Sequence, residues 1–379
     1  MKQIKLLLLL VITATACKGQ PSDVIERAEK PAPITFSLAD YYTKNAVLDS
    51  SVEALYQALS DSSRLAQMIV TSAGELGMPQ SHVLKCAEEN LIGGVIFLKG
   101  SKTSNKAFID QLNDVATKNN TLPLLFSIDA EPSLYNRRVI GSELNIPKTI
   151  TIKDAAQAYD VAQQIDGEIT EMGFQQNYAP VVDLSPNNEA IKDRSFGSNA
   201  DTVVEKAIGF IKGTQDNQVV ATAKHFPGHG YVKGDTHKQS VYIDGELSEL
   251  DVYKPIIKAG VLSIMVAHVT VKNNEKYGTD GLPSTCSRVI VTDLLRNELG
   301  FDGIIVTDAM NMMAAVNSGE SGPLKAALAG CDMILMPPSE KQLIGELLTA
   351  QATDVEVQQQ FEASVKRILR LKLCLNMID

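Results

Sequence analysis

The chain has 379 residues, of which 44% are hydrophobic, 21% are charged and 5% are aromatic, and it contains no tryptophan. This composition is that of a globular protein and excludes a disordered or fibrous chain. The 45 acidic residues outnumber the 35 basic residues, and the resulting net charge of −10 argues against a protein that binds nucleic acid.

The N-terminus has the pattern of a targeting segment. Residues 1–16 combine a short basic region, an apolar run too short to span a bilayer, and small residues, which is typical of a secretory signal peptide. Cys17 follows directly, and the arrangement resembles the cleavage site of a bacterial lipoprotein, where this cysteine becomes the lipid-modified first residue. We therefore expect a secreted lipoprotein, periplasmic or anchored to the outer membrane through Cys17. Secretion with an unmodified cysteine is the alternative.

The remainder of the chain divides into a tether and a folded domain. Residues 17–35 are rich in proline and polar residues and predict a tether that holds the domain away from a membrane. Residues 36–379 form the predicted domain. Its four cysteines, at 86, 286, 331 and 374, contain no Cys-x-x-Cys pair and are expected to behave as small buried apolar residues.

Short apolar runs alternate with helical patterns along this domain. The runs occupy residues 68–71, 94–98, 122–129, 177–179, 219–224, 263–268, 303–308 and 332–336. Helical patterns between them include residues 155–172, 202–215, 255–260 and 292–299, and Gly173 and Gly300 are expected to end two of these helices. Continuous apolar strands that alternate with helices are typical of a parallel sheet that is buried on both faces.

Eight such units predict an α/β fold in the form of a single (β/α)8 TIM-type barrel. A doubly wound open sheet is the alternative, but it would require a glycine-rich phosphate loop after an early strand. The nearest candidate, Gly93-Gly94, precedes its strand instead. Because the chain ends soon after the last helical pattern, we expect no C-terminal sandwich domain.

Polar residues end four of the apolar runs, where a barrel enzyme carries its chemistry. These residues are Asp129, Lys224-His225, His268 and Asp308. An aspartate at such a position can also cap the following helix. Helix capping does not account for the lysine or for the two histidines, which therefore indicate a functional site.

Three of the five histidines lie within residues 224–237, in a segment whose proline and glycines predict a shaped loop. Asp235 stands two residues before His237, and a carboxylate beside an imidazole raises its basicity and fixes its tautomer. This pair could supply a general acid and base. A zinc site built from His225, His229, Asp235 and His237 is an alternative, although the spacing matches no common zinc motif. Incidental histidines on an exposed loop are a second alternative.

The same loop resembles a family signature. It reads Lys-His-Phe-Pro-Gly-His-Gly, then four residues, then Asp-Thr-His. This is similar to the motif of the β-N-acetylhexosaminidase branch of glycoside hydrolase family 3, which has serine in place of Thr236. The resemblance extends over most of residues 64–375 and includes segments at 193–198, 265–268, 299–312 and 364–372.

The resemblance implies a role for each matching residue. Asp308 matches a nucleophile that forms a covalent glycosyl-enzyme, and His237 matches the acid/base, with Asp235 as its partner. Substrate-binding roles are implied for Asp129, Arg137, Arg194, Lys224, His225 and His268. Arg138 is an alternative to Arg137. The family pattern implies no metal and no organic cofactor.

One segment departs from the family pattern. Where the family has Asp-x-Glu-Gly-Gly, this chain has Asp129-Ala-Glu131-Pro132-Ser133. Proline fixes φ, and serine does not adopt the positive φ of glycine cheaply. We therefore expect a reshaped loop after Asp129, with consequences for Arg137 and for substrate preference.

The sequence as a whole predicts a retaining exo-β-N-acetylglucosaminidase that acts on terminal β-linked GlcNAc of peptidoglycan fragments or chitooligosaccharides. A phosphorylase is a competing hypothesis, because a histidine acid/base does not repel a phosphate anion. A metal-dependent hydrolase and a non-catalytic cell-wall glycan-binding lipoprotein also compete with this prediction. The sequence predicts no oligomeric state.

Overall fold

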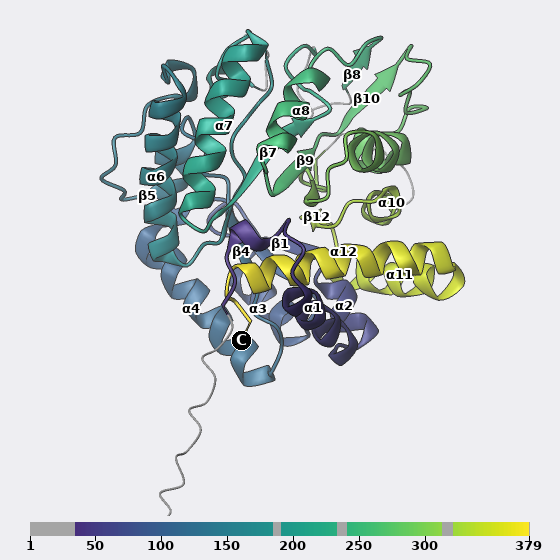
Figure 1. The fold of residues 1–379 in the computed structure, drawn as a ribbon. Helices are drawn as coiled ribbons and strands as arrows, with labels where there is room; N and C mark the ends of the chain where they lie inside the picture. The colour runs from purple at the N-terminus through teal and green to yellow at the C-terminus, as the bar shows by residue number, and fades with distance from the viewer. Residues whose placement is uncertain (1–34, 185–190, 233–240, 313–320, 379) are drawn as a thin grey trace, which may run out of the picture. The chain divides into compact units, whose positions relative to one another are not determined.

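The structure is a computed structural model, and it describes residues 35–184, 191–232, 241–312 and 321–378. The eight predicted strands are present and form one parallel sheet (Figure 1). They are β1 (Ile69–Ala73), β2 (Gly94–Phe97), β4 (Leu125–Ile128), β6 (Gln176–Asn177), β7 (Val220–Phe226), β9 (Ser263–Val266), β11 (Ile304–Thr307) and β12 (Ile334–Leu335).

The strands follow one another around a barrel in chain order, from β1 through β2, β4, β6, β7 and β9 to β11, with β12 paired back to β1. A single parallel bridge between Val306 and Met333 joins β11 to the segment that enters β12. The predicted (β/α)8 barrel is therefore confirmed, and this isolated bridge joins its last two strands.

Helices cover the outside of this barrel (Figure 1). The helices are α1 (Ala46–Ala58), α2 (Asp61–Ala66), α3 (Gln80–Glu88), α4 (Lys102–Asn119), α5 (Tyr135–Arg138), α6 (Ala155–Met172), α7 (Ala200–Asp216), α8 (Leu250–Lys258), η5 (Val289–Glu298), α10 (Gly322–Ala329), α11 (Glu340–Thr353) and α12 (Val355–Cys374). Helix α6 matches its predicted bounds. It begins where the Asp154 side chain accepts a hydrogen bond from Gln157 N–H, and it ends at Gly173 with φ of 100°.

The described chain also contains two short strand pairs and several 3-10 turns outside the barrel sheet. Two small parallel pairs form between β3 (Gly100–Ser101) and β5 (Val139–Ile140), and between β8 (Val241–Asp244) and β10 (Val269–Lys272). The 3-10 turns are η1 (Leu38–Asp40), η2 (Thr149–Thr151), η3 (Lys192–Arg194) and η4 (Ser284–Cys286). Because β8 follows the histidine-rich loop and β10 directly follows His268, their pairing brings these two loop ends together.

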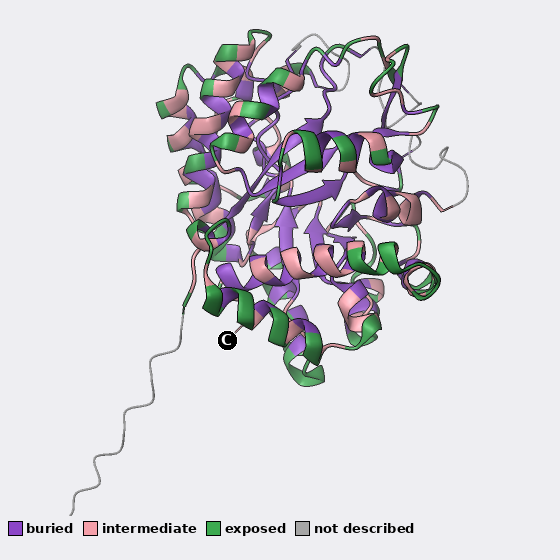
Figure 2. Ribbon diagram, turned by 45° about the vertical axis from the view of Figure 1, so that its right-hand side comes forward, coloured by how far each residue is buried: buried purple, intermediate pink, exposed green. Residues whose placement is uncertain are grey.

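The barrel strands are buried along their whole length, whereas the helices expose their outer faces (Figure 2). This is the pattern expected of strands that read as continuous apolar runs. At the N-terminal end of the strands the buried Lys372 donates hydrogen bonds to Gln67 and to the carbonyls of Gly93 and Pro123, at 2.6 to 3.0 Å. Burial lowers the pKa of Lys372 to about 7. Among the described residues no helix is long and apolar enough to cross a membrane.

Candidate active site

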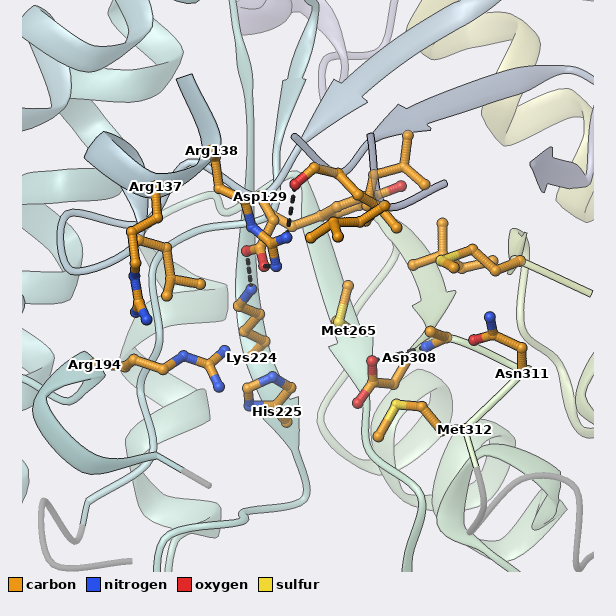
Figure 3. A pocket seen from close by; sticks show the side chains of 18 of the residues that line it. Asp129, Arg137, Arg138, Arg194, Lys224, His225, Met265, Asp308, Asn311 and Met312 are labelled. Carbon is orange, nitrogen blue, oxygen red and sulfur yellow. Dashed lines mark hydrogen bonds and ion pairs between the residues drawn. The ribbon is translucent and has the colours of Figure 1, made fainter. Parts of the chain in front are cut away.

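A cavity of about 440 Å³ opens at the C-terminal ends of the barrel strands. This volume is in the range of sites for small molecules. Six of the residues predicted from the sequence line it: Asp129, Arg137, Arg194, Lys224, His225 and Asp308. Figure 3 shows the basic residues and Asp129 on one side of the cavity and Asp308 on the other. Met265 and Met312 supply apolar surface nearby.

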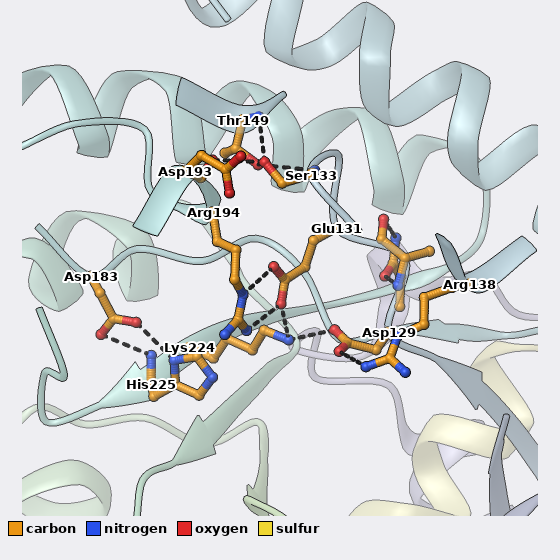
Figure 4. Close-up of polar contacts among 12 residues, drawn as sticks. Asp129, Glu131, Ser133, Arg138, Thr149, Asp183, Asp193, Arg194, Lys224 and His225 are labelled. Carbon is orange, nitrogen blue, oxygen red and sulfur yellow. Dashed lines mark hydrogen bonds and ion pairs between the residues drawn. The ribbon is translucent and has the colours of Figure 1, made fainter. Parts of the chain in front are cut away.

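Lys224 is the centre of a buried charge cluster on the first side (Figure 4). It lies near the end of β7, and its Nζ is 2.6 Å from Asp129 and 2.6 Å from Glu131. Glu131 in turn accepts two hydrogen bonds from Arg194, at 2.6 and 2.7 Å, in a bidentate pair. Burial raises the pKa of Asp129, but the positive charges of Lys224, Arg138 and Arg194 outweigh it and hold that pKa well below its usual range.

The two candidate arginines of α5 have different places. Arg138 contacts Asp129 at 3.3 Å and also donates to the carbonyl of Leu98 at 2.6 Å. Arg137 is exposed at the cavity edge, where its guanidinium donates to the carbonyl of Ser133 at 3.4 Å. The structure therefore puts Arg138 beside the carboxylate, while both arginines line the cavity.

Ser133 explains how the chain accommodates its departure from the family pattern. Its hydroxyl donates to the carbonyl of Asp193 at 2.7 Å and accepts from Thr149 N–H at 2.9 Å. A glycine at this position would make neither bond. The serine thus fastens the loop after β4 to η3, the turn that carries Arg194.

His225 is held from behind by a carboxylate. Its Nδ1 is 2.7 Å from Asp183, and Asp183 also accepts from the backbone N–H groups of His225 and His229, at 3.2 and 2.8 Å. Burial raises the pKa of Asp183, but His225 opposes it and the net shift is downward. This contact with Asp183 fixes the orientation of the His225 ring (Figure 4).

Glu249, at the start of α8, joins the ends of two loops. One of its oxygens accepts from Leu184 N–H at 2.6 Å and the other from Gly230 N–H at 2.9 Å. Burial, together with the nearby charge of Asp183, raises the pKa of Glu249 to about 8. Gly228 passes so close to this carboxyl group that an added Cβ would collide with one of its oxygens.

Asp308 follows β11, and its backbone N–H donates to Val266 in the neighbouring β9 at 2.9 Å. Its side chain accepts from Ala309 N–H at 2.7 Å. Residues 309–312 form a turn, so Asp308 caps no helix in this described stretch.

His268 lies behind this turn. Its Nε2 is 2.9 Å from the carbonyl of Ala309, which can only accept, so Nε2 carries the hydrogen. Its Nδ1 is 2.9 Å from the Thr285 hydroxyl. His268 is not one of the described residues that line the cavity. Its contacts instead support the residue next to Asp308.

Asp235 and His237, the predicted acid/base pair, lie outside the described residues, as does Cys17. Two site residues that the sequence patterns did not indicate are Glu131 and Asp183. Glu131 stands only two residues after Asp129, and its closeness to the end of that apolar run could have indicated it as a site residue. Asp183 follows a strand of two residues, β6, and the apolar signal there is too short to mark a strand end.

Comparisons with known proteins agree with this architecture. The family model described as "Glycosyl hydrolase family 3 N terminal domain" matches residues 62–371. A beta-hexosaminidase of Vibrio cholerae is 31% identical over 297 residues, covering 74% of this chain and 87% of that protein. A beta-hexosaminidase of Tolumonas auensis is 34% identical over 256 residues, covering 64% and 75% respectively.

Solved structures give the same result. A family 3 beta-N-acetylglucosaminidase from Paenibacillus superposes with a TM-score of 0.77 at 28% identity, and the match covers 84% of this chain and 63% of that one. A beta-N-acetylhexosaminidase from Beutenbergia cavernae gives a TM-score of 0.74 at 26% identity, covering 82% and 98%.

Proposed function

The chain belongs to glycosyl hydrolase family 3 and is a glycoside hydrolase, and from this premise we propose that it is a retaining exo-β-N-acetylglucosaminidase. The proposed substrates are peptidoglycan fragments or chitooligosaccharides with a terminal β-linked GlcNAc. The similarity to beta-hexosaminidases from two bacteria supports this substrate class. The observation that carries the proposal is the position of Asp308 across the cavity from the cluster of Asp129, Lys224 and Arg194.

In the proposed first step a carboxylate oxygen of Asp308 attacks the anomeric carbon. The bond from that carbon to the leaving oxygen breaks, and His237 gives its proton to this oxygen. A covalent glycosyl-enzyme on Asp308 results. In the second step His237 takes a proton from water, the water oxygen bonds to the anomeric carbon, and Asp308 leaves as a carboxylate. Asp235 keeps the imidazole of His237 oriented through both steps.

The opposite side of the cavity is suited to holding a sugar. Asp129 can accept hydrogen bonds from hydroxyl groups, and its side chain keeps 15% of its surface exposed. Arg194, Lys224 and His225 supply donors to hydroxyl and acetamide oxygens. Because these side chains are already fixed by buried carboxylates, they need little rearrangement when the sugar binds.

The first experiment is release of 4-nitrophenol from its β-GlcNAc glycoside by the wild-type protein and by the variants Asp308→Ala and His237→Ala. Asp302→Ala is the matched control, because this aspartate is 77% exposed and pairs only with Arg367 among the described residues. Each assay is run with and without EDTA, and with and without phosphate. We expect turnover that both site variants abolish, that the control retains, and that EDTA leaves unchanged.

Different outcomes would point to a different function. Faster turnover in phosphate, with a sugar phosphate as product, would identify a phosphorylase. Inhibition by EDTA would favour a metal-dependent hydrolase. Saturable binding of GlcNAc oligomers by a protein without turnover would indicate a glycan-binding lipoprotein and would refute the enzymatic proposal.

We also propose that the protein is exported and anchored to a membrane through a lipid on Cys17. The support is the sequence of residues 1–17 alone. The test is fractionation of cells that express the wild type or Cys17→Ser. Export of the wild type into a membrane fraction, with the variant in the soluble fraction, is the expected result. Equal distribution of the two would contradict the proposal.

A further inference from the structure

A cluster of three metal-ligating side chains lies outside the cavity, between α3 and α11. His82 and Cys86 stand four residues apart on α3, and therefore on one face of this helix. Glu340 is the first residue of α11. Helix α3 follows β1 and α11 follows β12, so the cluster links the first and last units of the barrel across the pair β1–β12. One ligand atom from each residue lies within 4.8 Å of the others.

The spacing of these atoms fits a tetrahedral ion. Nε2 of His82 is 3.1 Å from Oε2 of Glu340 and 3.5 Å from Sγ of Cys86. Zinc binds nitrogen and oxygen at about 2.0 Å and sulfur at about 2.3 Å, so tetrahedral angles require separations of about 3.3 Å and about 3.5 Å. The two separations from His82 are thus close to those between zinc ligands, and the Cys86 and Glu340 ligand atoms lie within 4.8 Å of each other.

The surroundings orient the ligands and leave a way in. Thr71, on β1, donates to Oε1 of Glu340 at 2.5 Å, so Oε2 is the oxygen directed to His82. Cys86 and Glu340 are buried, whereas 35% of the His82 side chain is exposed. Solvent can therefore reach His82, and the hydroxyl of Thr71 is the kind of outer partner that orients a ligating carboxylate.

We propose that His82, Cys86 and Glu340 bind a divalent transition metal ion of the zinc type. Imidazole, thiolate and carboxylate together favour such an ion over Mg²⁺ or Ca²⁺, which prefer oxygen ligands alone. On binding, the Cys86 thiol loses its proton to solvent as the metal–sulfur bond forms. Neutral His82 binds through the Nε2 lone pair and carries its one ring hydrogen on Nδ1, so no proton leaves the imidazole. The ion cross-links α3 to α11.

This role is structural and separate from the proposed hydrolysis. None of the three residues lines the cavity described above. A chelator should therefore lower the thermal unfolding midpoint without abolishing turnover. The cluster can also exist as a hydrogen-bonded contact that needs no ion, and the experiment distinguishes these two states.

The experiment measures zinc binding by the full chain with calorimetry and metal analysis, and uses Mg²⁺ as a negative control ion. We expect one tight site per chain. We expect affinity to fall at least about 100-fold in His82→Ala and in Cys86→Ser, because loss of an outer support alone commonly weakens a site 10- to 100-fold. Glu89→Gln is the matched control, since this carboxylate also lies at the end of α3 but outside the cluster.

Two further readouts identify the ligands. Co²⁺ should give a thiolate charge-transfer band with the wild type and none with Cys86→Ser. Thr71→Val, which leaves all three ligands in place, should weaken zinc binding about tenfold or more, and it keeps the test valid if a ligand variant does not fold.

Two results would overturn the proposal. One is the absence of tight zinc binding by the wild type. The other is binding that all these variants retain, which would place the ion elsewhere, for example on the histidines of residues 225–237.

Discussion

Glu131 offers the sharpest test of the charge cluster, because its buried carboxylate pairs with both Lys224 and Arg194. In Glu131→Gln the shape of the side chain is nearly kept and its charge is lost. The amide can accept only through its oxygen, so at least one of the donors now faces an NH2 group. Among the described carboxylates Lys224 then keeps Asp129, which Arg138 also contacts, and Arg194 loses the bidentate pair with Glu131.

The structure sets the size of the effect. Removing one partner of a buried ion pair costs about 3–5 kcal/mol, because the remaining charge stays buried without compensation. For a domain of this size that loss lowers the unfolding midpoint by roughly 4–7 °C. The matched control is Asp193→Asn in the neighbouring turn, whose pair with Lys148 is largely exposed, at 36% for the aspartate and 68% for the lysine. The same carboxylate-to-amide change there should cost at most about 1 kcal/mol.

The assay is calorimetric unfolding of the three proteins at neutral pH, combined with steady-state kinetics on the β-GlcNAc glycoside. Because Arg194 loses its bidentate partner, KM should rise at least about tenfold, while kcat falls less, since Asp308 lies across the cavity from the cluster. Equal stability losses in Glu131→Gln and Asp193→Asn would refute the reasoning that the buried cluster depends on charge balance.

Three further predictions concern the loops around the site. Burial raises the folded-state pKa of Glu249 to about 8 from 4.5, so the folded protein keeps a proton that the unfolded chain releases. The free energy of unfolding should therefore fall as pH rises from about 4.5 to 8. Urea titrations at several pH values should show a weaker pH dependence in Glu249→Gln. Ser133→Ala removes the bond to Asp193 and should raise KM several-fold at unchanged kcat, which steady-state kinetics can refute by showing no change. Gly228→Ala places a Cβ against the Glu249 carboxyl group, at a residue whose φ is +133°. It should lower the unfolding midpoint by at least about 2 °C in a thermal scan. An unchanged midpoint would show that the loop shifts without cost.

The strands could be predicted from sequence because a parallel barrel buries both faces of each strand and so demands apolar runs. The same rule located Asp129, Lys224 and Asp308, which directly follow or end such runs. The rule could not locate Asp183, because β6, the strand that precedes it, has only two residues. The segment that carries Asp183 is aligned with β7 through a bridge between Val181 and Lys224.

Several features depend on contacts that no local pattern encodes. Arg137 and Arg138 are adjacent in one short helix, and only the direction of that helix decides which of them meets Asp129. The cluster of His82, Cys86 and Glu340 joins residues about 250 positions apart. The sequence predicts that Cys86 is a small buried residue, and it is buried. Its neighbours become known only once α3 meets the first residue of α11.

The cavity places its fixed charges and its proposed reacting group on different sides, and this separation has a physical reason. Cations that bind sugar oxygens would attract the nucleophile if they lacked carboxylate partners of their own, and a nucleophile drawn into their ion pairs would attack poorly. Asp129 and Glu131 compensate the charges of Lys224, Arg194 and Arg138 locally, while Asp183 holds the ring of His225. Asp308 is positioned through its backbone bond to β9 and through Ala309, which His268 supports. The buried carboxylates thus serve the proposed reaction by keeping the sugar-binding cations from competing with the anomeric carbon for Asp308.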